Sequence, residues 1–504
     1  MDNSSDTMRV LVILGHPRTD SFCAALADRY CSALDRLGIP FHKLVLAELS
    51  FVPNVDHASI HDQALERDLV RAREEIDRAD HLVFIYPVWW GMMPALLKGF
   101  LDRILLPGFA FHERESGYEG LLVGKSAQLM TTMDTPPWVV RWILRRPGHR
   151  AFEIATLRFC GIRPVRTRMF GPLKNSTAAQ RHHWLEAAAS EADLLRGGRL
   201  RGPEARRDRA LAWLSALRLQ FYPMSWLAFT TGAALVVPIP GLWAQPAYWW
   251  GYAVLFLIEA ITVFLNETHD FESDRRNTHH SSFNGGSRVL VEHRLTSRDL
   301  RMGCMIAGAA ALVCSLILQL SSPAPPWVNF ACLFVALILG IGYTVPPLKF
   351  SHRGAGEFVV AFTHSLLVIQ CGSLILGGPF ANWPIWQLGL PLFLAVLPSI
   401  TLSGLPDRAA DQAAGKRTLA VKLGPRAAIA FAIAATAASA TLVLTWGSHW
   451  PDWAAAATVA HASGVVWMAA REAKHPAARR IDMLLVLALS YILWFVVIPL
   501  IYPS

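Results

Sequence analysis

Acidic residues that follow two of the long apolar stretches have the spacing of a cation site. Asn266, Asp270 and Asp274 are four residues apart, and Asp407 and Asp411 repeat that spacing. Residues four apart lie on one face of a helix. Carboxylates at a membrane boundary are costly unless they pair or bind a cation, and oxygen ligands suit Mg²⁺, which joins carboxylates to substrate phosphates. We predict that these five residues bind Mg²⁺ and a diphosphate; for either set alone, the alternative is a solvated helix end.

Basic residues close to both acidic sets could neutralise the remaining charge of a diphosphate. They are Arg288, Lys349, Arg353, Lys416 and Arg417. We expect Lys349, Arg353 and Lys416 to act in catalysis together with the acidic residues. Zinc is not expected, because the nearby histidines lack a convincing tetrahedral set and carboxylates favour a harder ion.

Three loops in the first 140 residues indicate a different chemistry. The loop GHPRTDSF at 15–22 leads into a helix, whose free backbone N–H groups would form a phosphate site; a plain strand-to-helix turn is the alternative. The loop YPVWWGMMP at 86–94 contains adjacent tryptophans, which are costly at a surface unless they wall a planar ligand; burial in the core is the alternative. The third loop is TTMDTPPW at 131–138.

Strand-like and helix-like patterns alternate along the first 175 residues and must position these loops. Strand-like apolar runs occupy 9–14, 41–46, 81–86, 126–132 and 164–170. Helical patterns occupy 21–37, 61–79, 94–105 and 149–160. Short apolar strands separated by amphipathic helices imply a parallel sheet covered on both faces. We predict an α/β, doubly wound, flavodoxin-like sheet in the order 2-1-3-4-5, with its ligand at the carboxyl ends of the strands.

GHPRTDSF, YPVWWGMMPALLKGFLDRI and the TT after the fourth strand resemble the flavin-binding NAD(P)H:quinone oxidoreductase family over residues 8–195. The third loop departs from the Thr-Gly-Gly common in that family. The resemblance implies a flavin, FAD before FMN, and NADH or NADPH as reductant, and it leaves open a homodimer through this domain. It also implies the flavin-binding residues: phosphate contacts from His16, Ser21 and Phe22, ring contacts from Pro87, Trp89, Trp90 and Gly91, and contacts to the isoalloxazine edge from Thr131 and Thr132.

The pattern of the back half predicts a polytopic membrane domain. Hydrophobic residues make up 53% of the chain, too many for two ordinary soluble domains. After a basic linker at 196–214 come nine segments close to the ~20 residues that cross a bilayer, at 223–243, 248–266, 301–320, 328–345, 358–377, 386–404, 425–446, 453–470 and 481–501.

The distribution of charge predicts how this domain is oriented. Arg and Lys fill one alternating set of loops and are missing from the other, and positive loops mark the cytoplasmic side. The front half lacks a signal-peptide pattern. We therefore expect a multi-pass protein of the cell (inner) membrane, with the front domain cytoplasmic and the C-terminus on the opposite side. The net charge of +9 suits a lipid bilayer, and no nucleic-acid partner is expected, because the basic residues cluster beside apolar spans.

The acidic motifs also resemble those of the UbiA superfamily of intramembrane aromatic prenyltransferases. The motif NxxxDxxxD is present from Asn266, and the second motif lies in DRAADQAAGKRTLAVKLG. FNGGSRVLVE and GYTVPPLKFSHRGAGE resemble loops of its naphthoquinone-forming, menaquinone-type branch, and Glu267 stands where Asp is common. The resemblance covers 215–504 and implies transfer of a prenyl group from prenyl diphosphate to an aromatic acceptor, either a hydroquinone or a hydroxynaphthoate-like compound.

The predicted organisation is a quinone reductase (1–195), a juxtamembrane linker (196–214) and a prenyltransferase (215–504). A hydroquinone is a good nucleophile and a quinone a poor one, so the reductase could supply reduced acceptor or reduce the prenylated product. Two alternatives remain open. The membrane half could be an inactive anchor or lipid-quinone-binding module, or the front half could be a redox sensor without turnover.

Overall fold

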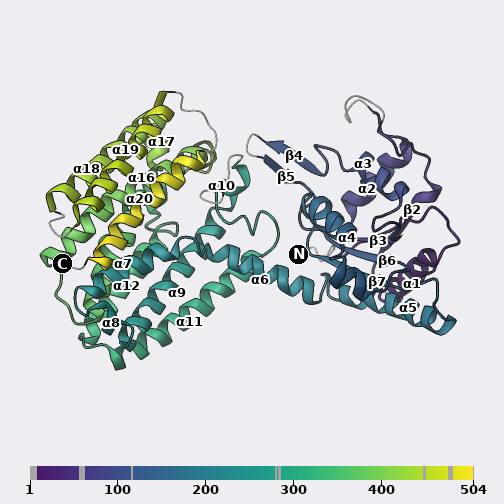
Figure 1. Cartoon of the computed structure of the whole chain (residues 1–504), viewed down its shortest axis with the longest axis horizontal. Helices are drawn as coiled ribbons and strands as arrows, with labels where there is room; N and C mark the ends of the chain where they lie inside the picture. Colours follow the sequence, from purple (N-terminus) through teal and green to yellow (C-terminus); the bar gives the residue numbers. More distant parts are fainter. Residues whose placement is uncertain are drawn as a thin grey trace. The chain divides into compact units, whose positions relative to one another are not determined.

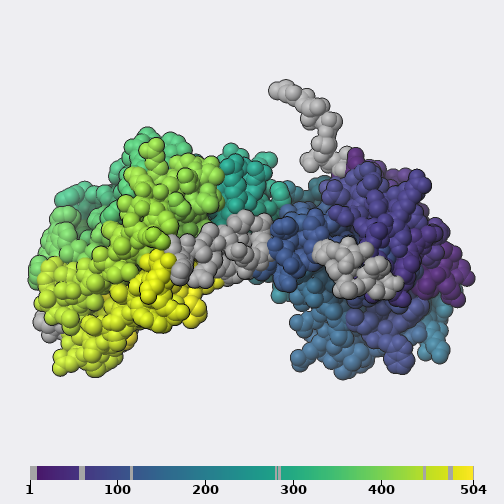
Figure 2. Space-filling view, turned by 90° about the horizontal axis from the view of Figure 1, so that it is seen from above, coloured from purple at the N-terminus to yellow at the C-terminus, as the bar shows by residue number. Residues whose placement is uncertain are grey.

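The computed structural model describes residues 8–55, 63–114, 117–277, 281, 285–446, 450–474 and 481–502. The chain divides into two compact units (Figure 1). Unit 1 comprises Met1–Leu211 with Glu292–Arg294, and unit 2 comprises Ala212–Val291 with Leu295–Ser504. In the space-filling view, the purple-to-blue residues of unit 1 and the teal-to-yellow residues of unit 2 each gather into a body of their own (Figure 2).

Unit 1 is built on a five-stranded parallel sheet in the order β2-β1-β3-β6-β7. The predicted strand order 2-1-3-4-5 is therefore confirmed. Every residue of β1, β3 and β6 is buried, because helices cover both faces and the strands need apolar side chains on each side. The strands are β1 (Val10–Leu14), β2 (Phe41–Val45), β3 (His81–Pro87), β6 (Ser126–Thr132) and β7 (Val165–Phe170).

Alternate residues of the central strands pack on opposite helical layers. Val10, Val12 and Leu14 belong to a core with α1 (Phe22–Arg36) and α5 (Ala178–Glu191). Leu11 and Ile13 belong to a second core with α2 (Arg67–Arg78) and α3 (Ala95–Ile104). This layering leaves the carboxyl ends of the strands, and the loops that follow them, outside the two cores.

Several elements of unit 1 differ from the sequence-based expectation. The helix expected at 149–160 is a short α4 (Pro147–Arg150) that continues as a π-helix, η3 (Ala151–Arg158). The hairpin of β4 (Phe111–Arg114) and β5 (Gly117–Gly120) was not predicted, nor was α5, which Thr177 and Gln180 cap reciprocally. The remaining short turns are η1 (Leu46–Glu48), η2 (Val139–Ile143) and η4 (Ala192–Leu195).

Unit 2 is helical, and seven of its described helices are long and apolar enough to cross a membrane. They are α9 (Pro246–His269), α11 (Ser297–Ser321), the continuous run Gly356–Ile375, α16 (Trp383–Ala413), α18 (Pro425–Trp446), α19 (Asp452–Lys474) and α20 (Asp482–Ile501). The run Gly356–Ile375 consists of α14 (Gly356–Phe362), the π-helix η5 (Thr363–Leu367) and α15 (Val368–Ile375).

The prediction of nine spans is not confirmed. The segments predicted at 223–243 and 328–345 form shorter helices, α7 (Tyr222–Ala234) of 13 residues and α12 (Pro326–Gly342) of 17 residues. The first shortens because the chain leaves the helix before Pro238, and the residue preceding a proline disfavours helical backbone. Shorter elements complete the unit: α8 (Ile239–Leu242), α10 (Phe271–Arg276), α13 (Phe350–Arg353) and α17 (Leu419–Leu423). Helix α6 (Pro203–Leu217) lies largely in the predicted linker and spans the boundary between the two units at Leu211.

Helices α7 and α15 touch backbone to backbone through two glycines. A methyl group on Gly232 would overlap the carbonyl oxygen of Ile369, and one on Gly372 would overlap that of Phe229. Small residues of this kind allow membrane helices to approach closely and gain dispersion contacts. The pair therefore sets the distance between two helices of the main core of unit 2.

We predict that Gly232→Ala destabilises unit 2. The added methyl group must push α7 from α15, and overpacking of this kind costs about 1–3 kcal/mol. Thermal unfolding of the detergent-solubilised protein should show a lower Tm. Gly308→Ala in α11 is the matched control, because a methyl group there meets open space and Ala is the better helix former. Equal Tm values for the two variants would contradict the close contact.

Candidate functional site

A cavity of about 310 Å³ opens among the helices of unit 2. Its walls are mostly apolar side chains from α12, α14, α16 and α20, among them Leu339, Val359, Val396, Ile400 and Leu489. The lining also includes every residue of the two acidic motifs, Asn266, Asp270, Asp274, Asp407 and Asp411. The structure thus places at one cavity the two motifs that lie some 130 residues apart in sequence.

The first acidic motif spans a break between two helices. A continuous helix was expected, but α9 ends at His269 and Asp270 caps it with φ −91° and ψ 2° before α10 begins. The turns nevertheless stay in register, because the N–H of Asp270 donates to the Asn266 carbonyl and the N–H of Asp274 to the Asp270 carbonyl, both at 2.8 Å. The break turns α10 while keeping the side chains on the cavity.

The second acidic motif lies on a helix and not in the loop predicted after residue 404. Helix α16 continues to Ala413, so Asp407 and Asp411 sit one turn apart near its end. The helix contains Pro391, Pro398 and Pro406, and membrane helices tolerate proline where neighbours satisfy the freed carbonyl groups. The prolines therefore do not mark where this helix ends.

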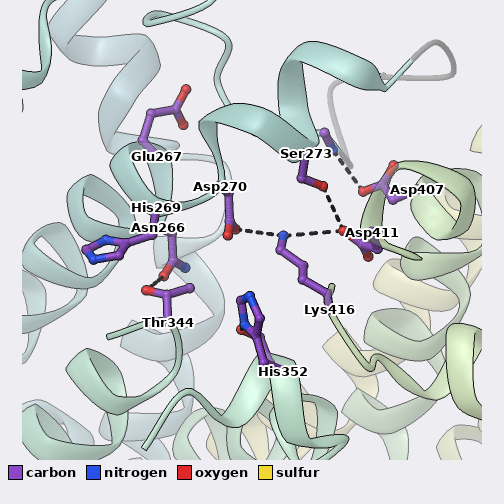
Figure 3. Close-up of polar contacts among 12 residues, drawn as sticks. Asn266, Glu267, His269, Asp270, Ser273, Thr344, His352, Asp407, Asp411 and Lys416 are labelled. Carbon is purple, nitrogen blue, oxygen red and sulfur yellow. Dashed lines mark hydrogen bonds and ion pairs between the residues drawn. The ribbon is translucent and has the colours of Figure 1, made fainter. Parts of the chain in front are cut away.

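Lys416 joins the two motifs (Figure 3). Its Nζ lies 3.0 Å from Oδ2 of Asp270 and 3.3 Å from Oδ1 of Asp411. Burial alone would lower the pKa of Lys416, but these two carboxylates outweigh it and hold the pKa above its usual range. The ammonium group therefore stays charged and acts as an internal cation between α9 and α16.

Further hydrogen bonds fix the remaining carboxylates. Asp407 accepts from the amide of Asn277 at 2.7 Å and from the N–H of Gly285 at 3.2 Å. Asp411 accepts from the hydroxyl of Ser273 at 2.9 Å (Figure 3). The loop after α10 comes so close that a methyl group on Gly286, whose φ is +71°, would overlap the Asp274 carboxylate. Residues 283 and 284 of the FNGGSRVLVE motif lie outside the described residues.

The cluster carries more negative charge than Lys416 balances. Burial, and after it the carboxylates of Asp270 and Glu267, raises the pKa of Asp274 to about 8. Oδ1 of Asp270 is buried without a hydrogen-bond partner, while Asn266 accepts from the hydroxyl of Thr344 at 2.8 Å. An orphaned carboxylate oxygen among hard donors fits a divalent cation, although the described residues form no ready cage of three or more His, Cys, Asp or Glu side chains.

The other predicted basic residues do not meet at the cavity. Lys349 and Arg353 are absent from its described lining. Arg353 instead donates to the Pro347 carbonyl at 2.7 Å, and Arg288 to the Asp274 carbonyl at 2.9 Å. Among the three basic residues expected to act in catalysis, only Lys416 is among the lining residues that the structure describes, and the roles of the other two stay predictions.

The cavity lining includes an acid and a histidine that the sequence analysis did not single out. Glu259 lies in the middle of α9, and His364 lies in the π-helix η5. Glu259 is the one acidic residue of the apolar segment predicted at 248–266. An ionisable residue inside a membrane helix generally faces a cavity and serves function, so that signal could have identified it.

Unit 1 presents the predicted flavin residues at the carboxyl end of its sheet. Ser21 is the N-cap of α1, and its hydroxyl accepts the Ala24 N–H at 3.2 Å. His16 accepts the Arg18 N–H at 2.9 Å, and burial, followed by Arg18, lowers the pKa of His16. Phe22, the first residue of α1, lies edge-on to Trp184 at 6.2 Å. These residues lie at the start of α1, and backbone N–H groups at a helix start can bind an anion.

The tryptophan loop combines a strained backbone with an indole ring that is exposed to water. Trp89 and Met92 exchange backbone hydrogen bonds of 2.9 and 3.0 Å, which forces a tight turn after Pro87. Trp90 and Gly91 occupy the turn with φ of 53° and 76°. Trp90 is fully exposed, while the ring of Trp89 lies 5.7 Å from that of His16. A strained backbone that displays an indole fits a wall for a planar ligand such as a flavin.

The third loop brings in a histidine that was not predicted as a site residue. Thr131 and Thr132 are buried at the end of β6, and Thr131 shares a hydrogen bond of 2.9 Å with Nε2 of His149. Burial, followed by Arg146, lowers the pKa of His149 to about 4, so its ring is neutral near pH 7. No sequence motif identified His149. It lies 18 residues after Thr131, and the segment between them is irregular, so no regular spacing relates the two residues.

Comparisons with known proteins match both units. The flavodoxin-like fold family matches residues 8–193, and the UbiA prenyltransferase family matches residues 225–494. An uncharacterized NAD(P)H oxidoreductase of Haemophilus influenzae is 28% identical over 190 residues, which cover 36% of this chain and 94% of that protein. A 2-carboxy-1,4-naphthoquinone phytyltransferase of Synechocystis is 27% identical over 224 residues, covering 42% of this chain and 66% of that protein.

Among solved structures, one of a digeranylgeranylglyceryl phosphate synthase is 17% identical with a TM-score of 0.40, covering 58% of this chain and 99% of that chain. The UbiA match covers more than half of the chain, and the flavodoxin-like match covers most of unit 1. The chain belongs to the UbiA prenyltransferase family and carries, before that domain, a flavodoxin-like domain of the NAD(P)H:quinone oxidoreductase type.

Proposed function

We propose that this protein is a membrane enzyme with two activities. Unit 2 transfers a prenyl group from prenyl diphosphate to an aromatic acceptor, and unit 1 reduces a quinone with NADH or NADPH. The observation that supports the first activity is the cavity, which has a charged end formed by both acidic motifs and Lys416 and otherwise mostly apolar walls. A prenyl diphosphate has the same division into a charged head and a hydrocarbon tail.

The residues of the cavity suit each step of such a transfer. The apolar walls hold the tail and exclude water from an allylic cation. Asn266, Asp270, Asp274, Asp407 and Asp411 would hold Mg²⁺, which when bound supplies charge that stabilises the leaving pyrophosphate. Lys416 adds a fixed positive charge beside them, and preorganised charge of this kind is an effective form of catalysis.

The acceptor proposed here is an electron-rich hydroquinone or hydroxynaphthoate-like ring. A relative of unit 2 is named for phytyl transfer to a carboxylated naphthoquinone, which supports a bicyclic acceptor of the menaquinone type. A hydroquinone ring attacks an allylic cation readily and a quinone ring does not. Reduction in unit 1 would therefore prepare the acceptor for unit 2, or else reduce the prenylated product.

A flavin is the proposed cofactor of unit 1. His16, Ser21 and Phe22 lie where they would hold its phosphates, and Pro87, Trp89, Trp90 and Gly91 would border its ring, with Thr131 and Thr132 near the ring edge. The exposed indole of Trp90 and the buried, neutral His149 support this assignment. FAD in preference to FMN stays a prediction, as does a homodimer through this domain.

The membrane orientation is part of the same proposal. The basic loops lie next to the acidic motifs, and positive residues favour the cytoplasmic side. Unit 1 and the charged end of the cavity would thus face the cytoplasm in a cell (inner) membrane. Arg471 and Lys474 end α19, so α20 would carry the C-terminus to the opposite side.

We predict that Asp270→Ala and Asp411→Ala each reduce prenyl transfer by a factor on the order of 100 or more, because each removes a preorganised ligand of the charged end. NAD(P)H oxidation by unit 1 should stay nearly unchanged. Glu272→Ala is the matched control, because this acid lies in sequence between Asp270 and Asp274 but is exposed and pairs with Arg275. Near wild-type prenyl transfer in either aspartate variant would refute the assignment.

Purified protein is expected to be yellow and to bleach on addition of NADH or NADPH. Trp89→Ala and Trp90→Ala should each weaken flavin retention by roughly 3- to 10-fold, because stacking on an aromatic ring contributes about 0.5–1.5 kcal/mol. Equilibrium dialysis would measure this loss for FAD and FMN separately. Trp142→Ala, which changes another exposed tryptophan of unit 1, should leave retention unchanged. A colourless protein that takes up neither flavin would exclude a reductase.

Prenylation that starts from an oxidised quinone should require NAD(P)H, whereas prenylation of the chemically reduced hydroquinone should not. A short linker raises the effective concentration of one site at the other. Cutting an inserted protease site at residues 197–202 should therefore slow turnover from the quinone more than turnover from the hydroquinone, with uncut protein as control. Equal effects on both reactions would show that the fusion does not deliver the acceptor.

A further inference from the structure

A segment of unit 1 displays several large apolar side chains to solvent. It spans residues 138–146, between the third loop and α4. The exposed fractions of its side chains are 75% for Trp142, 63% for Ile143, 61% for Trp138 and 53% for Leu144. Single apolar residues at a surface are ordinary, but a run of this kind generally marks an interaction site.

The 138–146 segment is also strongly basic. The stretch 135–152, which contains it, has four arginines and no Asp or Glu. Arg141 and Arg145 are exposed, and no acid in the described ranges pairs with them or with Arg146. Unit 1 itself therefore leaves this positive charge unbalanced beside the apolar side chains.

The backbone holds the segment in a strained shape. Val140 is buried in its middle, and the N–H of Arg146 donates to the Val140 carbonyl at 2.8 Å. Arg145 and Arg146 both have a left-handed backbone, with φ of 57° and 56°. This conformation is costly for residues other than glycine and is concentrated at functional sites. Strain and exposed apolar surface thus coincide in one short segment.

An anionic lipid surface is the partner that fits both properties of the segment. Tryptophan is enriched at the boundary between headgroups and acyl chains, and arginine is attracted to anionic headgroups. Unit 2 is the membrane domain of the same chain, so a bilayer is always within reach of unit 1. A second copy of the chain fits less well, because a two-fold contact through this segment would bring the arginines of both copies together.

We propose that residues 138–146 dock unit 1 onto the anionic surface of the bilayer. The indole and aliphatic side chains enter the headgroup region, and the arginines contact lipid phosphates. A contact of this size is reversible, because interfacial attachment strengthens with the apolar area buried and with the charge that meets the lipids.

The same segment adjoins the predicted flavin site of unit 1. A methyl group on Gly148 would overlap the carbonyl oxygen of Gly91, so the backbone just after the segment touches the tryptophan loop. His149 shares its hydrogen bond with Thr131 of the third loop, and Trp90 is fully exposed. Docking would bring this site to the surface of the phase in which quinones with long apolar tails dissolve. That consequence rests on the proposed reductase activity, whereas the docking does not.

Hydrogen–deuterium exchange of the full chain, in nanodiscs that hold one copy each, tests the docking. Amides of 138–146 should exchange roughly 10-fold more slowly in phosphatidylglycerol mixed with phosphatidylcholine than in phosphatidylcholine alone, and high salt should remove the difference. Arg141→Gln combined with Arg145→Gln should lose this protection, because each arginine near an anionic surface strengthens attachment on the order of fivefold. Arg36→Gln combined with Arg71→Gln is the matched control, because it removes the same charge from exposed sites on α1 and α2.

The apolar half of the proposal has its own variant. Trp142→Ser leaves the net charge unchanged and should also lose the protection. Equal exchange of the segment in both lipids, or wild-type protection in both the arginine and the tryptophan variants, would overturn the proposal. Slow exchange that appears only with two copies in a nanodisc, whatever the lipid, would show a contact between copies and would overturn it as well.

Kinetics with NADH separate the docking from the proposed reductase. The double arginine variant should raise the KM for a naphthoquinone with a geranylgeranyl tail in the bilayer roughly 10-fold, and should change the KM for water-soluble 1,4-benzoquinone less than about 2-fold. If the wild type oxidises NADH with neither quinone but its 138–146 segment is protected by anionic lipid, the reductase fails and the docking stands. Equal changes for the two quinones would overturn the link between docking and quinone supply.

Discussion

The burial of like charge at one end of the cavity is the constraint on which unit 2 depends. Carboxylates this close repel one another and lose hydration, so each needs a compensating partner. Lys416 supplies one positive charge for Asp270 and Asp411. Ser273 donates a hydrogen bond to Asp411, and Asn277 and the Gly285 N–H donate to Asp407. These partners come from α10, the loop after it and the segment after α16, so the arrangement of those segments is set by the need to satisfy the acids.

This constraint explains irregularities that helix propensity alone does not. Helix α9 stops at His269 although its backbone bonding continues into α10, because the turn brings Ser273 within 2.9 Å of Asp411. The loop after α10 must pass so close to Asp274 that glycine is required at 286. Burial, and after it the carboxylates of Asp270 and Glu267, raises the pKa of Asp274, and a divalent cation bound among these acids would supply positive charge that Lys416 alone does not.

The sequence predicts those parts of the fold that are determined by residues close to one another along the chain. The central strands β1 and β3 are largely apolar because both faces of the sheet are buried there, and the strand order predicted from the alternation with helices is confirmed. The nine-span prediction failed because apolar length does not show where a helix ends, as the 13 residues of α7 illustrate. The salt bridge of Lys416 and the contact of Thr131 with His149 depend on packing between distant segments, which no spacing in the sequence encodes.

In the proposed function, the two activities are linked by a difference of two protons and two electrons in the acceptor. Reduction of a quinone creates hydroxyl donors and an electron-rich ring at once, so a cavity that recognises the donor also recognises the nucleophile. Specificity of this kind is strong, because a site built to pair a hydroxyl group is left with unpaired acceptors when the hydroxyl is missing. A reductase in the same chain would then keep the reduced form of the acceptor in supply.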